Sequence, residues 1–285
     1  MSDFILLFNG REGSSPLITQ LSNHPQVLVP IFEQFDRRVL QPRLENNGMA
    51  IEDFISQILN RSLSETTKKI IKNAVGKEMV SRLEQCSTTD IIGFKWRPWG
   101  NPSVLKQKLI YPVKFLTIAR INLLHLALSL LFSEKLREDR PELSEHPQFY
   151  AKSLSDDEYQ KFFESLMNTR IRPSEHKVTH LMRHLIQQKQ GLIRYMGEIL
   201  GGKPLIVFYE EIFSSSGDGL RVVFEFLDLP PYAEEKQPST STFRKSGMSD
   251  PSVQVENYEE LLEDFKVKAL QEEWMGLFKS LAPSP

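Results

Sequence analysis

The chain has 285 residues, of which 40% are hydrophobic and 10% aromatic, a composition typical of a globular protein with a sizeable core. Its 35 basic and 37 acidic residues give a formal net charge of −2, which excludes the strongly basic surface of a general nucleic-acid-binding protein. A single cysteine, Cys86, excludes an internal disulfide, so the sequence does not require an oxidising compartment.

The N-terminal segment has no basic region, and its apolar run over 4–8 is too short for a signal peptide. The most apolar later stretch, 121–132, is too short to cross a bilayer and contains polar residues. We therefore expect a soluble, cytoplasmic protein with no integral membrane segment and no nucleic-acid partner. The sequence leaves the oligomeric state open.

The first predicted elements alternate between strand and helix. The run Phe4–Phe8 is typical of a buried parallel strand. A polar loop follows, and a helix is predicted to open near Pro16. The remaining elements predicted up to residue 134 are strands at 27–29, 90–95 and 114–118 and helices at 51–63, 66–84 and 122–134.

In the second half, 135–172 is interpreted as helix plus loop, and Ser174 is predicted to cap a long helix that reaches Leu200. A strand at 205–209, a helix at 220–227, a long loop at 231–256 and helices at 257–267 and 269–281 complete the chain. Alternating strands and helices predict an α/β fold with a central parallel β-sheet flanked by helices. We expect one domain over 1–285, with helical insertions around 40–88 and 135–200.

The loop after the first predicted strand has features of a phosphate-binding site. Gly13 lets the backbone approach an anion, and Ser14 and Ser15 add hydroxyl donors at a helix N-terminus. Arg11 adds a positive charge. The segment lacks both the lysine of the nucleoside-triphosphatase loop and the dinucleotide fingerprint. An ordinary strand–helix turn with small residues is the alternative interpretation.

A second candidate follows the strand predicted to end near residue 119. Arg120 stands at the carboxyl end of that strand, where ligands bind in open α/β sheets. Ser129 lies nine residues further on, so a loop-to-helix turn would bring both side chains to one anion. The alternative is a salt-bridged arginine and a serine that hydrogen-bonds within its own helix.

Taken in order, these segments resemble the sulfotransferases that use 3'-phosphoadenosine-5'-phosphosulfate (PAPS). The run 11–15 (REGSS) resembles the family's 5'-phosphosulfate loop, and 120–129 is similar to its 3'-phosphate segment in a bacterial branch. The strand 92–95 (IGFK) is similar to the family's central strand, which ends in a lysine near the active site. Tyr209 matches a tyrosine near the adenine, and 243–247 (FRKSG) resembles a late loop that closes over the 3'-phosphate.

The resemblance implies a P-loop-like sulfotransferase fold, nearest to the bacterial carbohydrate-type enzymes, with PAPS as the donor co-substrate. It implies catalytic roles for Arg11 and Lys95. The residues that it implies in PAPS binding are Arg11, Gly13, Ser14, Ser15, Arg120, Ser129, Tyr209, Arg244, Lys245, Ser246 and Gly247.

The general base of the cytosolic family members has no obvious counterpart in this sequence, because Arg97 stands where those members have their catalytic histidine. Glu33 lies in a stretch loosely similar to the Pro-Glu-aromatic segment of bacterial carbohydrate sulfotransferases, whose glutamate serves as base. We predict Glu33 as the base, with Asp36 and His24 as substitutes. A solvated carboxylate after a strand is the alternative interpretation of Glu33.

These observations predict transfer of a sulfuryl group from PAPS to a hydroxyl of a carbohydrate, a glycolipid or a small metabolite. No metal is expected. His176, His180 and His184 share a helical face but lack the glutamate of a zinc-protease motif, so we interpret them as a partly solvated face. The alternatives are an ATP-dependent, kinase-like transferase and a catalytically inactive nucleotide-binding protein on the same scaffold.

Overall fold

The computed structural model describes residues 2–8, 12–29, 37–87, 90–96, 102–140, 154–200, 204–213, 218–230, 248 and 250–279. The chain forms two compact units. The first, here called the sheet unit, comprises Met1–Ala119 and Gln190–Glu235; the second, the helical unit, comprises Arg120–Lys189 and Lys236–Pro285. The long helix α10 (Glu175–Leu200) contributes residues to both units.

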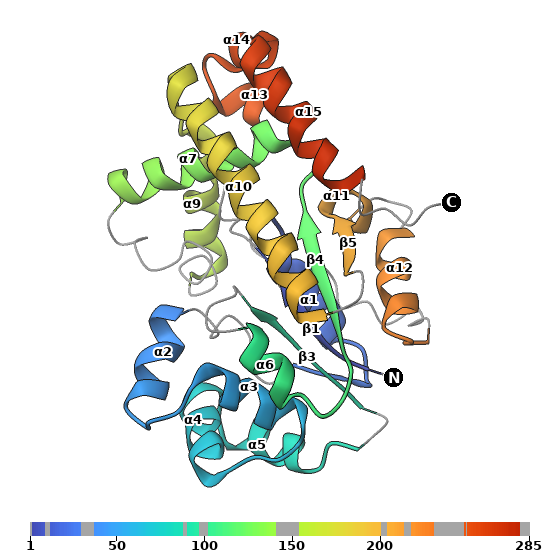
Figure 1. Cartoon of the computed structure of the whole chain (residues 1–285). Coiled ribbons are helices and arrows are strands. Elements are labelled where there is room, and N and C mark those ends of the chain that lie inside the picture. The colour runs from blue at the N-terminus through green and yellow to red at the C-terminus, as the bar shows by residue number, and fades with distance from the viewer. Residues whose placement is uncertain are drawn as a thin grey trace. The chain divides into compact units, whose positions relative to one another are not determined.

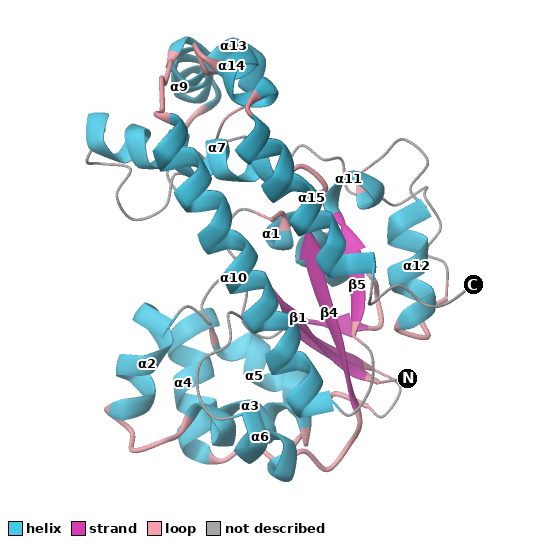
Figure 2. Cartoon of the chain, turned by 45° about the horizontal axis from the view of Figure 1, so that its top comes forward, coloured by secondary structure: helices cyan, strands magenta, loops and turns pink. Residues whose placement is uncertain are grey.

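The sheet unit contains five parallel strands in the order β2-β3-β1-β4-β5. Figure 1 labels β3, β1, β4 and β5, and Figure 2 shows the strands in magenta. Their bounds are β1 Asp3–Leu7, β2 Val27–Leu28, β3 Ile91–Trp96, β4 Val113–Ala119 and β5 Leu205–Phe208. Every residue of β1 is buried, as expected for a parallel strand covered on both faces. The predicted α/β class with a central parallel sheet flanked by helices is confirmed.

Helices cover both faces of this sheet. Successive side chains of a strand point to opposite faces, so Ile5 and Leu7 join one hydrophobic cluster while Phe4 and Leu6 join another. The bounds of the helices in this unit, besides the end of α10, are α1 Ser14–Ser22, α2 Arg37–Glu45, α3 Ile51–Leu59, α4 Glu65–Val75, α5 Lys77–Glu84, α6 Pro102–Lys108, α11 Tyr209–Ile212 and α12 Asp218–Phe226. Helices α2 to α6 and the end of α10 contribute to the first cluster, and α1, α11 and α12 to the second.

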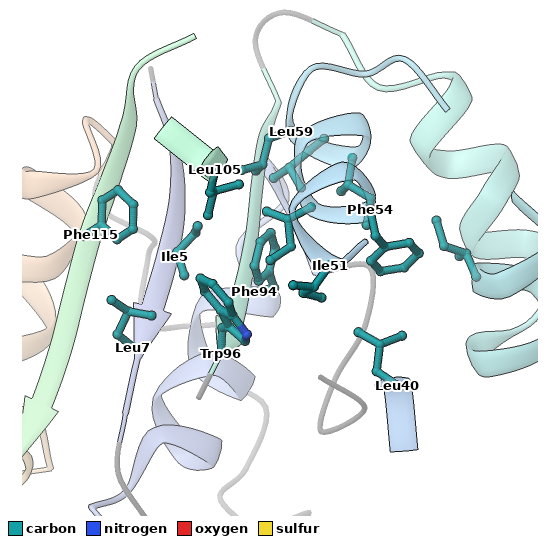
Figure 3. Packing of buried hydrophobic residues seen from close by; sticks show 14 of the residues in the cluster. Ile5, Leu7, Leu40, Ile51, Phe54, Leu59, Phe94, Trp96, Leu105 and Phe115 are labelled. Atoms are coloured by element: carbon teal, nitrogen blue, oxygen red, sulfur yellow. The ribbon is translucent and has the colours of Figure 1, made fainter. Parts of the chain in front are cut away.

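Figure 3 shows the first cluster from close by, with β3 contributing Phe94 and Trp96 and α3 contributing Phe54 and Leu59. Because side chains alternate along β3, Lys95 points away from this cluster, towards the face that α1 covers.

The pairing of β1 with β3 depends on a glycine. Phe4 lies opposite Gly93 in the register of the two strands. A Cβ atom built on Gly93 would lie 2.1 Å from carbon atoms of the Phe4 ring, so the ring occupies the space that a side chain at 93 would need. The fully buried Phe4 ring therefore packs directly on the β3 backbone, two residues before Lys95.

The amino ends of β1 and β3 are tied together by a buried ion pair. The Arg61 guanidinium donates to both carboxylate oxygens of Asp3, at 2.8 and 3.0 Å. The Ile92 backbone N–H donates to Asp3 Oδ1 at 2.8 Å, and Arg61 also donates to the Asp90 carbonyl at 3.0 Å. One carboxylate thus joins β1, β3 and the turn after α3.

Several helix boundaries in the sheet unit differ from the prediction. The single helix predicted over 66–84 is wrong: Gly76, at φ 98°, separates α4 from α5. The helix predicted over 51–63 ends at Leu59, because Arg61 adopts a left-handed conformation at φ 54°. Helices α2 and α6 were not predicted.

The described elements of the helical unit are helices. Besides α10 they are α7 Leu123–Asp139, α9 Asp156–Asn168, α13 Pro251–Gln254, α14 Tyr258–Glu263 and α15 Phe265–Lys279. The predicted cap of α10 is confirmed, since the Lys177 N–H donates to Ser174 Oγ at 3.2 Å. None of the described helices is both long and apolar enough to cross a membrane.

Three boundary predictions in this unit are corrected. Helix α7 runs to Asp139 rather than to residue 134. The loop predicted up to residue 256 contains the short helix α13, which Asp250 caps. The break between the last two helices falls at Asp264 rather than near 268, because its carboxylate accepts from the Lys266 and Val267 N–H groups and so starts α15.

Candidate functional site

The described part of the first loop, Glu12 to Ser15, enters α1 in a conformation that requires glycine. Gly13 is the N-cap of α1 with φ 96° and ψ 19°. A Cβ atom at Gly13 would lie 2.1 Å from Cδ2 of Tyr209. The backbone therefore passes directly against the tyrosine ring, and the first N–H groups of α1 follow at once. The N-terminal end of a helix favours anions through these N–H groups and its dipole.

Lys95 brings a positive charge to the same helix terminus. Its side chain comes from β3 and is 4% exposed. The ammonium Nζ donates to Ser15 Oγ at 2.6 Å and lies 5.1 Å from the centroid of the Phe8 ring. An ammonium and the positive end of a helix both favour a negatively charged ligand. The predicted proximity of Lys95 to the first loop is thus found in the structure.

Tyr209 lies against the glycine of the first loop. Strand β5 ends at Phe208, one residue earlier than predicted, so Tyr209 is the first residue of α11. Its ring packs on Phe213 with the centroids 4.6 Å apart and against Gly13. The structure thus gathers Gly13, Ser15, Lys95 and Tyr209, with Ser14 buried in the first turn of α1.

Two residues next to this group were not singled out from the sequence. Phe8, beneath the lysine, was interpreted only as the end of the first strand. Glu12 is fully buried beside Gly13 and places a carboxyl group in the loop itself. The position of Phe8 directly after a buried strand could have indicated that it lies near the site. The sequence around Glu12 gives no such indication.

Replacing Gly13 with alanine is expected to destabilise the protein and to weaken binding of 3',5'-adenosine bisphosphate, the desulfated nucleotide (PAP). The left-handed conformation alone costs an L-residue about 1–2 kcal/mol, and the methyl group also displaces the Tyr209 ring. Chemical denaturation and calorimetric titration measure the two effects. Gly48→Ala is the matched control, because Gly48 also has a positive φ, 62°, but has open space where the methyl would stand. Equal losses in the two variants would contradict the role of the tyrosine contact.

The helical unit holds two more of the predicted residues. Arg120 directly follows the last residue of β4, as predicted, and is half-buried. Ser129 is half-buried on α7, and its backbone carbonyl accepts from Ser133 Oγ at 2.9 Å. That Arg120 and Ser129 bind one anion stays a prediction.

The remaining predicted positions lie outside the described residues. They are Arg11, Glu33 and the late-loop residues Arg244, Lys245, Ser246 and Gly247. Asp36, a substitute for the base, lies outside them as well. Their roles stay predictions.

His24, the other substitute base, is held as a structural residue. Its Nδ1 accepts from the Gln26 N–H at 3.2 Å, so Nε2 carries the proton that it donates to the Pro230 carbonyl at 3.3 Å. Burial lowers the pKa of the ring below its usual value, although the bond to Pro230 opposes this effect. With both nitrogens engaged and the ring buried, His24 is poorly placed to accept a proton from a substrate.

The histidines of α10 interact locally. The rings of His176 and His180 stack with their centroids 6.3 Å apart, and His184 Nε2 pairs with the Gln188 amide at 2.7 Å. Across the described ranges, no three histidine, cysteine or acidic side chains are grouped in a way that could hold a metal ion.

Comparison with known proteins gives matches in structure alone. No protein-family model and no curated protein sequence matches the chain. Among solved structures, it is similar to the sulfotransferase domain of the Synechococcus PCC 7002 olefin synthase, at 13% identity and a TM-score of 0.45, over 100% of this chain and 97% of that one. The sulfotransferase domain from the curacin biosynthetic pathway matches at 13% identity and a TM-score of 0.44, over 100% and 93%. A mouse sulfotransferase complexed with PAP matches at 13% identity and a TM-score of 0.37, over 97% and 85%.

Proposed function

We propose that this chain is a PAPS-dependent sulfotransferase in which the first loop and α1 hold the 5'-phosphosulfate. The observation that carries the proposal is the 2.6 Å contact between Lys95 Nζ and Ser15 Oγ at the N-terminus of α1. Further support comes from Gly13, whose left-handed conformation brings the loop backbone against Tyr209. In this proposal residues 1–285 form one sulfotransferase domain.

The donor groups gathered around α1 suit sulfate and phosphate oxygens. They are an ammonium, two serine hydroxyls and the N–H groups of a helix N-terminus. The lysine comes from β3 and not from the loop, so the loop itself differs from that of the nucleoside triphosphatases. The lysine missing from the loop sequence argues against ATP as the nucleotide.

Sulfuryl transfer makes demands that these residues can meet. The acceptor oxygen forms a bond to sulfur while the bond from sulfur to the 5'-phosphate oxygen breaks, so negative charge grows on that oxygen. Lys95 would stabilise this charge through its ammonium, and Arg11 would add a second positive charge. Glu33 would take the proton of the acceptor hydroxyl. Ser14 and Ser15 would keep the phosphosulfate aligned with the acceptor.

We assign the 3'-phosphate to Arg120, Ser129 and the late loop 244–247, and the adenine to Tyr209. The acceptor would be a hydroxyl of a carbohydrate, a glycolipid or a small metabolite, recognised by the helical segments 40–88 and 135–200. The resemblance of the Glu33 segment to bacterial carbohydrate sulfotransferases favours a carbohydrate.

Calorimetric titration of the purified chain with PAP, and separately with ATP and Mg²⁺, tests this proposal. We expect PAP to bind, and Arg120→Ala to weaken it at least about tenfold, because a charge-assisted contact to phosphate is lost. Binding of ATP with Mg²⁺ but not of PAP would identify a kinase-like transferase and overturn the proposal. PAP binding without turnover of PAPS on a panel of sugars, glycolipids and phenols would favour the inactive scaffold.

A further inference from the structure

The segment that carries Arg120 is held by two side chains of α15. Trp274 Nε1 donates to the Arg120 carbonyl at 2.7 Å. The Gln271 amide binds twice: its Nε2 donates to the Ile121 carbonyl at 2.8 Å, and its Oε1 accepts from the Leu123 N–H at 2.8 Å. All these residues belong to the helical unit, in which α15 contacts α7.

These three bonds satisfy backbone groups that regular structure leaves open. Leu123 is the first residue of α7, so its N–H has no partner within the helix. Arg120 and Ile121 precede the helix, so their carbonyls are not part of its hydrogen-bond pattern. Asn122, between Ile121 and Leu123, caps α7 by accepting from the His125 N–H at 2.9 Å. Side chains of α15 thus bind the backbone of Arg120, Ile121 and Leu123. The side chain of Asn122 caps the helix that follows.

The Trp274 side chain is buried and packed within the helical unit. Trp274 is 0% exposed, and its indole packs edge-on against Phe278 with the centroids 5.2 Å apart and the planes at 83°. Gln271 lies almost one helical turn before Trp274, on the same side of α15. Its amide is used as donor and acceptor at once, which neither an acid nor an alanine at this position would reproduce.

We infer that Gln271 and Trp274 are positioning residues for Arg120. They fix the backbone from which the Arg120 guanidinium extends. The side chain therefore loses less conformational entropy when it binds an anion. This inference rests on the proposed function, in which Arg120 binds the 3'-phosphate of the nucleotide.

The experiment compares PAP with 5'-AMP, which lacks the 3'-phosphate, by calorimetric titration of the full chain. Gln271→Ala should weaken PAP binding about tenfold, because the Arg120 segment must then be ordered when PAP binds, and should leave the affinity for 5'-AMP unchanged. In an Arg120→Ala background, Gln271→Ala should have no further effect on PAP. Gln160→Ala is the matched control, because Gln160 is an exposed glutamine on α9 of the same unit.

Hydrogen exchange of the ligand-free protein tests the hydrogen bonds independently of any nucleotide. The Leu123 amide should exchange faster in Gln271→Ala than in the parent or in Gln160→Ala. Trp274→Phe, which keeps an aromatic ring in the core but removes the donor, should weaken PAP in the same selective way.

The outcomes separate the inference from the function on which it rests. An equal loss for PAP and 5'-AMP, or an undiminished loss in the Arg120→Ala background, would overturn the positioning role while leaving a PAP-binding protein. Unchanged exchange at Leu123 would overturn it as well. A parent protein that binds no PAP would overturn both.

Discussion

Replacing Lys95 with methionine is expected to lower kcat for sulfuryl transfer about 100- to 1,000-fold, the range seen when one donor to a developing oxyanion is removed. Methionine fills a similar volume but carries no charge and no N–H donor, so the hydrogen bond to Ser15 Oγ and the ammonium at the α1 terminus are both lost. The affinity for PAP should fall much less than kcat, because the charge that Lys95 opposes is greatest in the transition state. The rate of PAP formation from PAPS, with the panel of hydroxyl acceptors, measures the effect.

Chemical denaturation of the Lys95→Met variant beside the parent separates a loss of catalysis from a loss of folding. Lys106→Met on the exposed side of α6 is the matched control and should retain the parent rate. Ser15→Ala should lower kcat in the same direction but by less, because it removes the partner of the ammonium and leaves the charge. A Lys95→Met variant with the parent's kcat would refute the assignment of Lys95 to the reaction.

Replacing Asp3 with alanine is expected to lower the free energy of unfolding by about 3 kcal/mol, the lower end of the range for a buried ion pair that loses one partner. The Asp3 side chain is 4% exposed and that of Arg61 21%, so water can compensate the remaining guanidinium only in part. The Ile92 N–H would also lose its acceptor. Chemical denaturation followed by circular dichroism measures the change.

The ion pair between Asp53 and Lys108 offers a contrast in the same unit. Its side chains are 43% and 36% exposed, so Asp53→Ala should cost at most about 1 kcal/mol. Similar losses in Asp3→Ala and Asp53→Ala would show that burial does not set the strength of these pairs. PAP affinity should survive in both variants, since Asp3 stands at the amino ends of the strands, away from the carboxyl-end loops.

The strands were predictable because their physical signal is local and strong. A parallel strand covered on both faces needs mostly apolar residues. Segment 4–8 (FILLF) is wholly apolar, and 90–95 (DIIGFK) and 114–118 (KFLTI) are predominantly apolar. Helix boundaries were harder, because apolar periodicity continues through a break. The spacing of apolar residues over 66–84 does not show whether Gly76 interrupts the helix or lies within it. In the structure Gly76 has φ 98°, which ends one helix before the next begins.

The candidate site was predictable only where its residues belong to a motif. The resemblance assigned Gly13, Ser15 and Lys95 to one ligand, and the structure places Lys95 Nζ next to Ser15 Oγ. The bonds of Gln271 and Trp274 to the Arg120 segment join positions about 150 residues apart. An isolated glutamine or tryptophan on an amphipathic helix carries no sign of such a partner, because its role depends on the tertiary packing of α15 against α7.

The packing of Phe4 on Gly93 makes the two positions a single volume shared by adjacent strands. Homologous chains ought to vary at these positions in concert: a small residue at 4 would leave room for valine or alanine at 93, whereas phenylalanine at 4 permits glycine alone. Since Lys95 follows on the same strand, such paired exchanges would preserve the strand spacing beneath the lysine, and covariation of 4 with 93 would serve as a marker of this fold in distant relatives.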